Sequence, residues 1–252
     1  MRFDNVLGLI PARYASTRFP GKPLADIGGK SMIQRVYEQS CKVLPIVYVA
    51  TDDVRIADAV KAFGGNVVMT SDTHPSGTDR CYEALTKVCE IEGRTFCAVV
   101  NIQGDEPFIQ PEQIELLASA FDDNSVEIAT LIKPVESSID LFNPNKPKVV
   151  ISDNCNALYF SRSPIPYFRG VEESEWHKRH EYYNHIGLYG YRADVLASIT
   201  RLPKGVLESC ESLEQLRWLE NGYTIKALQT HLESLSVDTP EDLTELKARG
   251  LI

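Results

Sequence analysis

The sequence lacks several features that would mark it for a membrane, a zinc site or a nucleotide-binding P-loop. No apolar run approaches the roughly 20 residues of a membrane-spanning helix, and residues 1–10 lack the layout of a secretory signal. None of the six cysteines forms a Cys-x-x-Cys pair, and the pattern G-x-x-x-x-G-K-[ST] is absent. We therefore expect a cytoplasmic protein whose cysteines are buried free thiols.

Basic residues are in deficit, since 26 Lys and Arg face 35 Asp and Glu, for a formal charge of −9. This balance argues against a general nucleic-acid partner and against docking on anionic membranes. Hydrophobic residues make up 43% of the chain, enough for a buried core. Residues 1–30 reverse the trend with five bases and two acids, which suggests a specific anion site.

Short apolar runs alternate with helical patterns in the first half of the chain. The apolar runs are 6–10, 46–50, 66–69 and 96–102, and the helical patterns between them are 32–41, 51–63 and 78–91. Ser31 could cap the first of these helices. This alternation predicts βαβ units, and the continuous apolar strands predict a sheet covered by helices on both faces. We therefore predict an α/β, Rossmann-like fold with a mostly parallel central sheet, whose ligands bind beyond the carboxyl ends of the strands.

The second half of the chain is less regular. Strands are predicted at 128–134, 149–151, 157–161, 185–192 and 224–228, and helices at 208–220 and 240–249. Residues 163–184 are rich in Pro, Tyr, Trp and charge, have no clear period, and could form a substrate lid or a dimer arm. Because no repeat or linker is found, we predict one domain, 1–252, with an inserted segment near 142–192.

The first candidate site is the loop after the first predicted strand. It carries Arg13, Arg18 and Lys22 on small or rigid neighbours, and Gly21 allows close approach of the backbone. Arginine forks and a lysine point charge together suit a polyphosphate. The alternative is a solvated basic loop.

Two aspartates are candidate metal ligands. Asp105 follows the most apolar predicted strand, where a carboxylate can hold Mg²⁺ against substrate phosphates, although a turn aspartate is the alternative. Asp238 is the second candidate, but it or Thr239 could simply cap the helix that Pro240 begins. The run 51–53 is interpreted as a helix start rather than as the metal motif of a glycosyltransferase.

Eight segments of the chain closely resemble the 3-deoxy-manno-octulosonate cytidylyltransferase (CMP-Kdo synthetase) family. They run in order along the chain and are residues 10–24, 74–80, 101–107, 142–145, 157–162, 185–192, 207–217 and 237–243. That family transfers CMP from CTP to the anomeric hydroxyl of Kdo, an acidic eight-carbon sugar, and its product feeds lipopolysaccharide assembly. The resemblance implies a nucleotidyltransferase fold of the nucleotide-diphospho-sugar transferase type, Mg²⁺ as cofactor and a homodimer.

The resemblance also implies roles for individual residues. Arg13, Arg18 and Lys22 would hold the CTP triphosphate and form the catalytic set with Asp105. Asp105 and Asp238 would bind Mg²⁺. Ser76 and Gly77 would lie near the cytosine and ribose. The residues that would meet the sugar are Arg80, Gln103, His185, Tyr191, Glu211 and Glu214. An arginine suits the sugar carboxylate, and two glutamates three residues apart on one helix would face the same hydroxyls.

The residues by themselves leave alternatives open. His185 could be a core histidine, Tyr191 a packing residue, and the glutamates of 208–220 a solvated helix face. Activation of another acid sugar, such as sialic acid or amino-Kdo, would keep the nucleotide half and change the sugar contacts. A non-catalytic nucleotide-binding module is disfavoured, because binding alone does not need two carboxylates that position an α-phosphate.

Overall fold

The computed structural model describes residues 2–15, 19–233, 237 and 239–248. They form two compact units: unit 1 comprises residues 1–119 and 233–252, and unit 2 comprises residues 120–232. Within the described ranges, no helix is long and apolar enough to cross a membrane. The elements of unit 1 are β1 (Val6–Ala12), η1 (Lys22–Leu24), α1 (Met32–Ser40), β2 (Ile46–Thr51), α2 (Val54–Ala62), β3 (Val67–Met69), α3 (Gly77–Glu92), β4 (Ala98–Asn101), α4 (Pro111–Ser119) and α10 (Pro240–Ala248).

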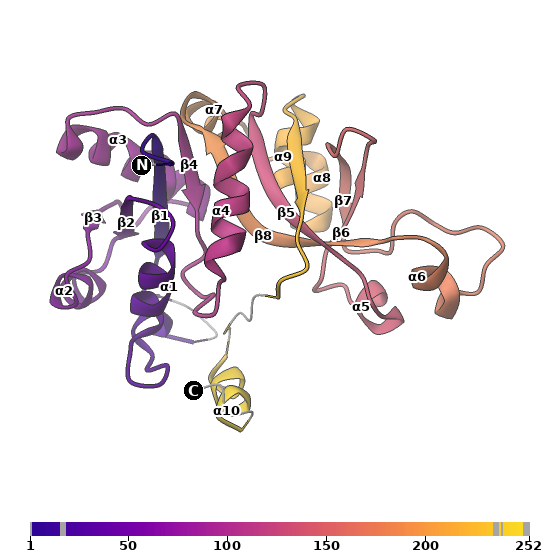
Figure 1. Ribbon diagram of the computed structural model, residues 1–252, viewed down its shortest axis with the longest axis horizontal. Coiled ribbons are helices and arrows are strands. Elements are labelled where there is room, and N and C mark those ends of the chain that lie inside the picture. Colours follow the sequence, from indigo (N-terminus) through magenta and orange to yellow (C-terminus); the bar gives the residue numbers. More distant parts are fainter. Residues whose placement is uncertain (1, 16–18, 234–236, 238, 249–252) are drawn as a thin grey trace. The chain divides into compact units, whose positions relative to one another are not determined.

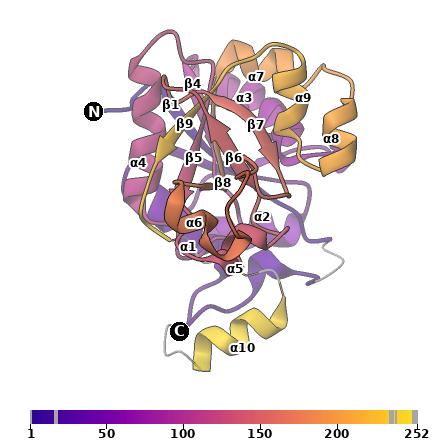
Figure 2. The same ribbon diagram turned by 90° about the vertical axis from the view of Figure 1, so that its right-hand side faces the viewer.

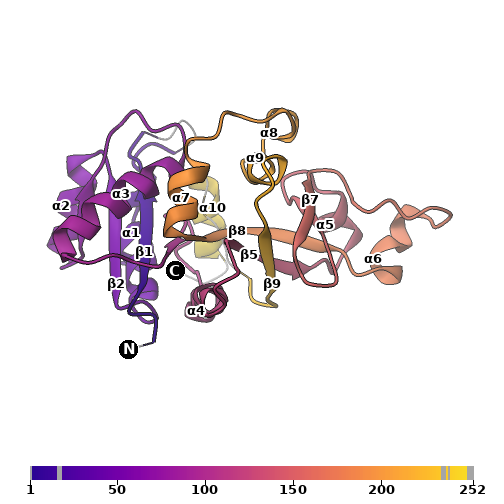
Figure 3. The same cartoon turned by 90° about the horizontal axis from the view of Figure 1, so that it is seen from above.

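The strands of unit 1 lie in the order β3-β2-β1-β4, and all their pairings are parallel. Leu7, Leu9 and Ile10 of β1 are fully buried, because α3 and α4 lie on opposite faces of these strands (Figures 2 and 3). The same pattern explains why the apolar runs were continuous rather than alternating. The predicted parallel strands and their helical cover are confirmed here.

Helices α1 and α2 each begin after a side chain that caps them. Ser31 Oγ accepts the N–H of Gln34 at the start of α1, and Asp53 Oδ1 accepts the N–H of Arg55 at the start of α2. Such caps satisfy amides that have no partner inside the helix. The helix starts predicted at Ser31 and at residues 51–53 are therefore confirmed.

Unit 2 is built around β5, a strand with mixed neighbours (Figure 1). β5 pairs antiparallel with β8 and parallel with β9, and β6 pairs antiparallel with both β7 and β8. The α/β class with a mostly parallel sheet is confirmed, whereas the single domain with an insertion near 142–192 stays a prediction. The elements of unit 2 are η2 (Ala120–Asp122), β5 (Ile128–Pro134), α5 (Ser138–Phe142), β6 (Lys148–Ile151), β7 (Ala157–Ser161), η3 (Glu173–Glu175), α6 (Trp176–Arg179), β8 (Tyr183–Arg192), α7 (Ala193–Ile199), α8 (Val206–Glu211), α9 (Gln215–Glu220) and β9 (Ile225–Gln229).

Residues 163–184, which have no clear hydrophobic period, pack around a small hydrophobic core. Trp176 and Tyr182 are buried, with their rings stacked 6.3 Å apart, and Leu141 of α5 packs with them. The Trp176 indole N–H donates to the Val171 carbonyl at 2.9 Å. Aromatic packing, rather than a repeating helix or strand, therefore orders this segment; its role as a lid or dimer arm stays a prediction.

The single helix predicted over 208–220 is wrong. Two short helices, α8 and α9, occupy this region, and Ser212 between them adopts a left-handed conformation with φ 53°. The break lets Arg217 of α9 reach back to Glu208 of α8, with two nitrogen–oxygen distances of 2.7 Å. Residues nine apart could not meet in this way on one straight helix, since side chains there face neighbours three or four residues away.

The expectation of buried thiols is also wrong for most cysteines. All six are free, but only Cys81 is buried and Cys89 is partly buried. Cys97 shows why: it comes just before β4 begins at Ala98, and its thiol faces the Asn5 carbonyl at the surface instead of the sheet interior. The exposed cysteines are Cys41, Cys97, Cys155 and Cys210.

Candidate functional site

Three segments of unit 1 meet around Pro11, the second-last residue of β1. A Cβ at Gly77, the first residue of α3, would lie 3.5 Å from the Pro11 ring. A Cβ at Gly104, after β4, would lie 3.0 Å from the Pro11 carbonyl oxygen, so only glycine fits there without displacement. Arg13 and Asp105 follow these strand ends, which is the edge where α/β folds bind their ligands.

Lys22 and Asp105 are brought together at this edge from 83 positions apart. The Lys22 Nζ donates to Asp105 Oδ2 at 2.7 Å. Their side chains are 13% and 32% exposed, so both charges are partly accessible to a ligand. Lys22 begins η1, and the left-handed turn before it is made by Gly21 at φ 74°. The sequence identified both residues but not the ion pair.

Tyr14 holds the base of the first loop. Its carbonyl accepts the N–H of Gly21 at 2.9 Å, and its ring lies 3.3 Å beneath the Arg55 guanidinium carbon. Arg13, next to it in the chain, is exposed. A further cation, Arg55, therefore lies against the start of this loop, at Tyr14. No sequence motif indicated this contact. Arg18 lies outside the described residues.

Ser76 and Gly77 form the start of α3. The Ser76 hydroxyl accepts the N–H of Asp79 at 3.2 Å and lies 2.6 Å from Asp79 Oδ2. Amides in the first turn of a helix point outward and favour an anionic or polar ligand. The placement of these two residues near a nucleoside stays a prediction.

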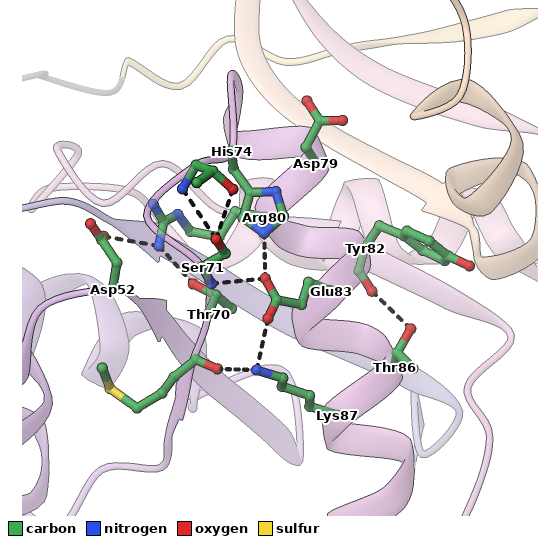
Figure 4. Close-up of polar contacts among 12 residues, drawn as sticks. Asp52, Thr70, Ser71, His74, Asp79, Arg80, Tyr82, Glu83, Thr86 and Lys87 are labelled. Atoms are coloured by element: carbon green, nitrogen blue, oxygen red, sulfur yellow. Dashed lines mark hydrogen bonds and ion pairs between the residues drawn. The ribbon is translucent and has the colours of Figure 1, made fainter.

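Arg80 is almost fully buried, with its side chain only 1% exposed. Its Nη1 donates to Thr70 Oγ1 at 2.6 Å and pairs with Asp52 Oδ1 at 2.9 Å (Figure 4). Burial lowers the pKa of Arg80, and the Asp52 carboxylate opposes that effect. The sequence pattern identified Asp52 only as part of a helix start. In the structure, Asp52 is the charge partner of Arg80, which is predicted to contact the sugar. The sugar contact of Arg80 stays a prediction.

Of the two candidate metal ligands, only Asp105 lies within the described residues. Gln103 and Asp105 follow β4, and the Asp105 carbonyl accepts the N–H of Val237 at 2.9 Å. Asp238 lies outside the described residues. Across the ranges that the structure describes, no group of three or more His, Cys, Asp and Glu could hold a metal. A lone partly exposed carboxylate nevertheless fits Mg²⁺, which takes one or two carboxylates with phosphate oxygens and water.

In unit 2, His185 and Tyr191 lie on β8. The His185 Nε2 is 3.0 Å from Thr130 Oγ1, and burial lowers the pKa of His185 to about 3. The imidazole is therefore uncharged at neutral pH, so it can form hydrogen bonds but cannot attract an anion by charge. The Tyr191 ring is fully buried, 5.5 Å from the Trp218 ring.

Glu211 and Glu214 do not share a helix, which corrects the expectation that they face the same hydroxyls. Glu211 ends α8, and Glu214 comes just before α9. The Glu211 carboxylate accepts the Ser161 hydroxyl at 2.6 Å and the Arg162 N–H at 2.9 Å. Ser161 and Arg162 lie within the segment 157–162 that resembles the family, but no local pattern indicated that they hold Glu211.

Comparison with known proteins supports the family resemblance that was seen in the sequence. Residues 7–228 match the cytidylyltransferase family model. The chain is 61% identical over 246 residues to the 3-deoxy-manno-octulosonate cytidylyltransferase of Parabacteroides distasonis and 61% over 245 residues to that of Phocaeicola vulgatus, with 96% of both chains covered each time. A CMP:2-keto-3-deoxy-manno-octonic acid synthetase solved with CTP matches with a TM-score of 0.88 at 42% identity, over 98% of this chain and 99% of that one. The chain therefore belongs to the cytidylyltransferase family and, within it, to the 3-deoxy-manno-octulosonate cytidylyltransferases.

Proposed function

We propose that this protein transfers CMP from CTP to Kdo and releases pyrophosphate. The observation that carries the proposal is the 61% identity, over 96% of both chains, to relatives that bear this activity as their name. In the reaction, the anomeric hydroxyl oxygen of Kdo forms a bond to the α-phosphorus of CTP. The bond from that phosphorus to the bridging oxygen breaks, pyrophosphate leaves, and the hydroxyl proton passes to water.

Lys22 and Arg13 would act on the triphosphate. Phosphoryl transfer depends mostly on positioning and on cations placed where charge develops. The Lys22 side chain is 13% exposed and is held in place by Asp105, so its ammonium group would already be positioned to neutralise a phosphate oxygen. Arg13, nine residues before Lys22, is exposed, and Arg18 is proposed to join them. Ser76 and Gly77 would contact the nucleoside.

Mg²⁺ is part of the proposal, with Asp105 and Asp238 as its protein ligands. When bound, the ion would neutralise phosphate charge and polarise the α-phosphorus. The Lys22 ion pair fixes the Asp105 carboxylate at the end of β4, and the Val237 N–H fixes the Asp105 backbone. This chain's own contribution is thus a carboxylate whose side chain and main chain are both restrained.

The sugar would be recognised by charge and by neutral hydrogen bonds. Arg80 is the cation proposed for the Kdo carboxylate, and the uncharged His185 would offer a hydrogen bond without attracting competing anions. Glu211, restrained by Ser161 and Arg162, would accept sugar hydroxyls. The other proposed contacts are Gln103, Tyr191 and Glu214.

We further propose that the protein works as a cytoplasmic homodimer and that its product serves lipopolysaccharide assembly. The support is the family resemblance and the aromatic segment of unit 2, where Tyr167 is 74% exposed beside Trp176. Light scattering at micromolar concentration should give twice the monomer mass of 28.2 kDa. A monomeric mass would refute the dimer without touching the reaction.

The reaction is tested with a sugar panel. Pyrophosphate release is measured with CTP, Mg²⁺ and each of Kdo, amino-Kdo and a sialic acid, and Kdo should give the highest kcat/KM. Faster turnover of another acid sugar would replace Kdo as the substrate and keep the nucleotide half of the proposal. Asp58→Ala, an exposed change on α2, serves as the control for effects of handling and folding.

A further inference from the structure

The loop between β3 and α3 is tied down by one carboxylate of the helix that follows it. Glu83 lies in the second turn of α3, and its side chain reaches back over residues 70–75 (Figure 4). Its Oε2 accepts the N–H of Ser71 at 2.9 Å and contacts His74 Nε2. Its Oε1 pairs with Lys87 Nζ at 2.7 Å. Three donors thus converge on a side chain that is 25% exposed.

The start of the same loop is fixed independently. The Thr70 N–H donates to the Thr51 carbonyl at 2.8 Å, and the Thr70 hydroxyl accepts from Arg80, which is itself paired with Asp52. The end of the loop is Ser76, which caps α3. Between these fixed ends, the contacts of Ser71 and His74 with Glu83 are what hold the middle of the loop against the helix.

The position of this loop matters because of what comes directly after it. Gly77 lies against Pro11, at the end of β1, where Arg13 and the first loop begin. The six residues 70–75 therefore decide how Ser76 and Gly77 approach the strand edge. A small shift of positioning groups is costly for binding and turnover, since alignment supplies a large part of catalysis in phosphoryl transfer.

We propose that Glu83 is a positioning residue for the nucleotide: it anchors the 70–75 loop through Ser71 and His74 and so sets where Ser76 and Gly77 meet CTP. Glu83 does not itself touch the substrate. The inference rests on the proposed function, because it takes the contact of Ser76 and Gly77 with the nucleoside from there.

The test is Glu83→Gln in the full chain, with CTP and Kdo varied separately in the pyrophosphate-release assay. A glutamine keeps the size but offers one acceptor oxygen to three donors, so the loop loses part of its anchor. We expect the KM for CTP to rise about tenfold, as loss of a hydrogen bond to a charged group would give, with the KM for Kdo and kcat each within about threefold of wild type. A general loss of structure would instead lower kcat.

Two further variants make the outcome decisive. Glu90→Gln removes an exposed carboxylate from the same helix and should leave all three parameters unchanged. His74→Ala removes one loop contact and leaves the helix intact, so it should raise the KM for CTP less than Glu83→Gln does while exchange of the Ser71 amide with deuterium speeds up in both. If neither variant changes the KM for CTP, the proposal is overturned.

Direct CTP binding separates this inference from the proposed function. Calorimetry with CTP alone should show weaker binding by Glu83→Gln in the same ratio as the KM change. If the wild type binds CTP but releases no pyrophosphate with Kdo, the proposed reaction fails and the binding ratio still decides the role of Glu83. Equal affinity in both proteins overturns the role of Glu83 and leaves the reaction standing; no CTP binding by wild type overturns both.

Discussion

Acid should lower the free energy of unfolding by protonating Glu83. The size of this effect follows from the groups that surround the Glu83 carboxylate. Burial by itself raises the pKa of Glu83, but the hydrogen bonds from Lys87, Ser71 and His74 outweigh it and lower the pKa from 4.5 to about 2. A carboxylate whose pKa is lower in the folded than in the unfolded protein stabilises the fold at pH values above its unfolded-state pKa. This stabilisation is lost as the pH falls toward the folded-state pKa. At 1.36 kcal/mol per pKa unit, and with some screening because the side chain is partly exposed, ionised Glu83 contributes about 2–3 kcal/mol at neutral pH.

The assay is urea unfolding of wild type and Glu83→Gln at several pH values between 7 and 3. The difference in unfolding free energy between the two proteins should be about 2–3 kcal/mol at pH 6–7 and should fall to about half of that near pH 3. Other carboxylates titrate in both proteins and cancel in the difference, and Glu90→Gln serves as the matched control. A difference that is absent at pH 7, or constant from pH 6 to pH 3, would refute the reasoning.

Three other changes have expected outcomes. Asp105→Ala should reduce pyrophosphate release by more than about a hundredfold, since it removes the only described carboxylate proposed to bind the metal, while circular dichroism stays unchanged; activity within tenfold of wild type would remove Asp105 from the mechanism. Arg217→Met should lower the unfolding free energy by about 3 kcal/mol, because it leaves Glu208, 9% exposed, without its charge partner; urea unfolding that matches wild type would contradict this. Ser212→Gly should raise the melting temperature slightly, by the equivalent of about 0.5–1 kcal/mol, because glycine adopts φ 53° without strain; a lower melting temperature would show that the Ser212 side chain stabilises the break between α8 and α9.

Local signals in the sequence were enough to place most of unit 1. The apolar run from Val6 predicted β1, and Ser31 marked the start of α1 before any tertiary contact was known. Both signals are local: burial on two faces makes a strand continuously apolar, and a helix needs a cap at its first turn. The same logic placed Asp105 at the carboxyl end of a strand, which is why the candidate site was found in the right loop.

The predictions from sequence were wrong or incomplete where side chains from different elements pair with each other. The sequence pattern predicted one helix over 208–220, whereas the chain turns at Ser212, with the Arg217–Glu208 ion pair across the turn and Arg162 bonded to the Ser212 carbonyl. Likewise, Asp52 reads locally as part of a helix start, and its pairing with Arg80 depends on parallel strands bringing the ends of β2 and β3 side by side. These contacts join residues that are nine and 28 positions apart and that meet only through tertiary structure, so no local pattern predicts them.

The distribution of thiols makes this chain ready for distance measurements without engineered attachment points. Cys41 and Cys97 are exposed in unit 1, and Cys155 and Cys210 are exposed in unit 2, while Cys81 is protected in the core. Replacing Cys89 and all but one exposed cysteine in each unit by serine would leave two positions for fluorescent dyes. Energy transfer between the two dyes would then show whether their distance changes when CTP is added.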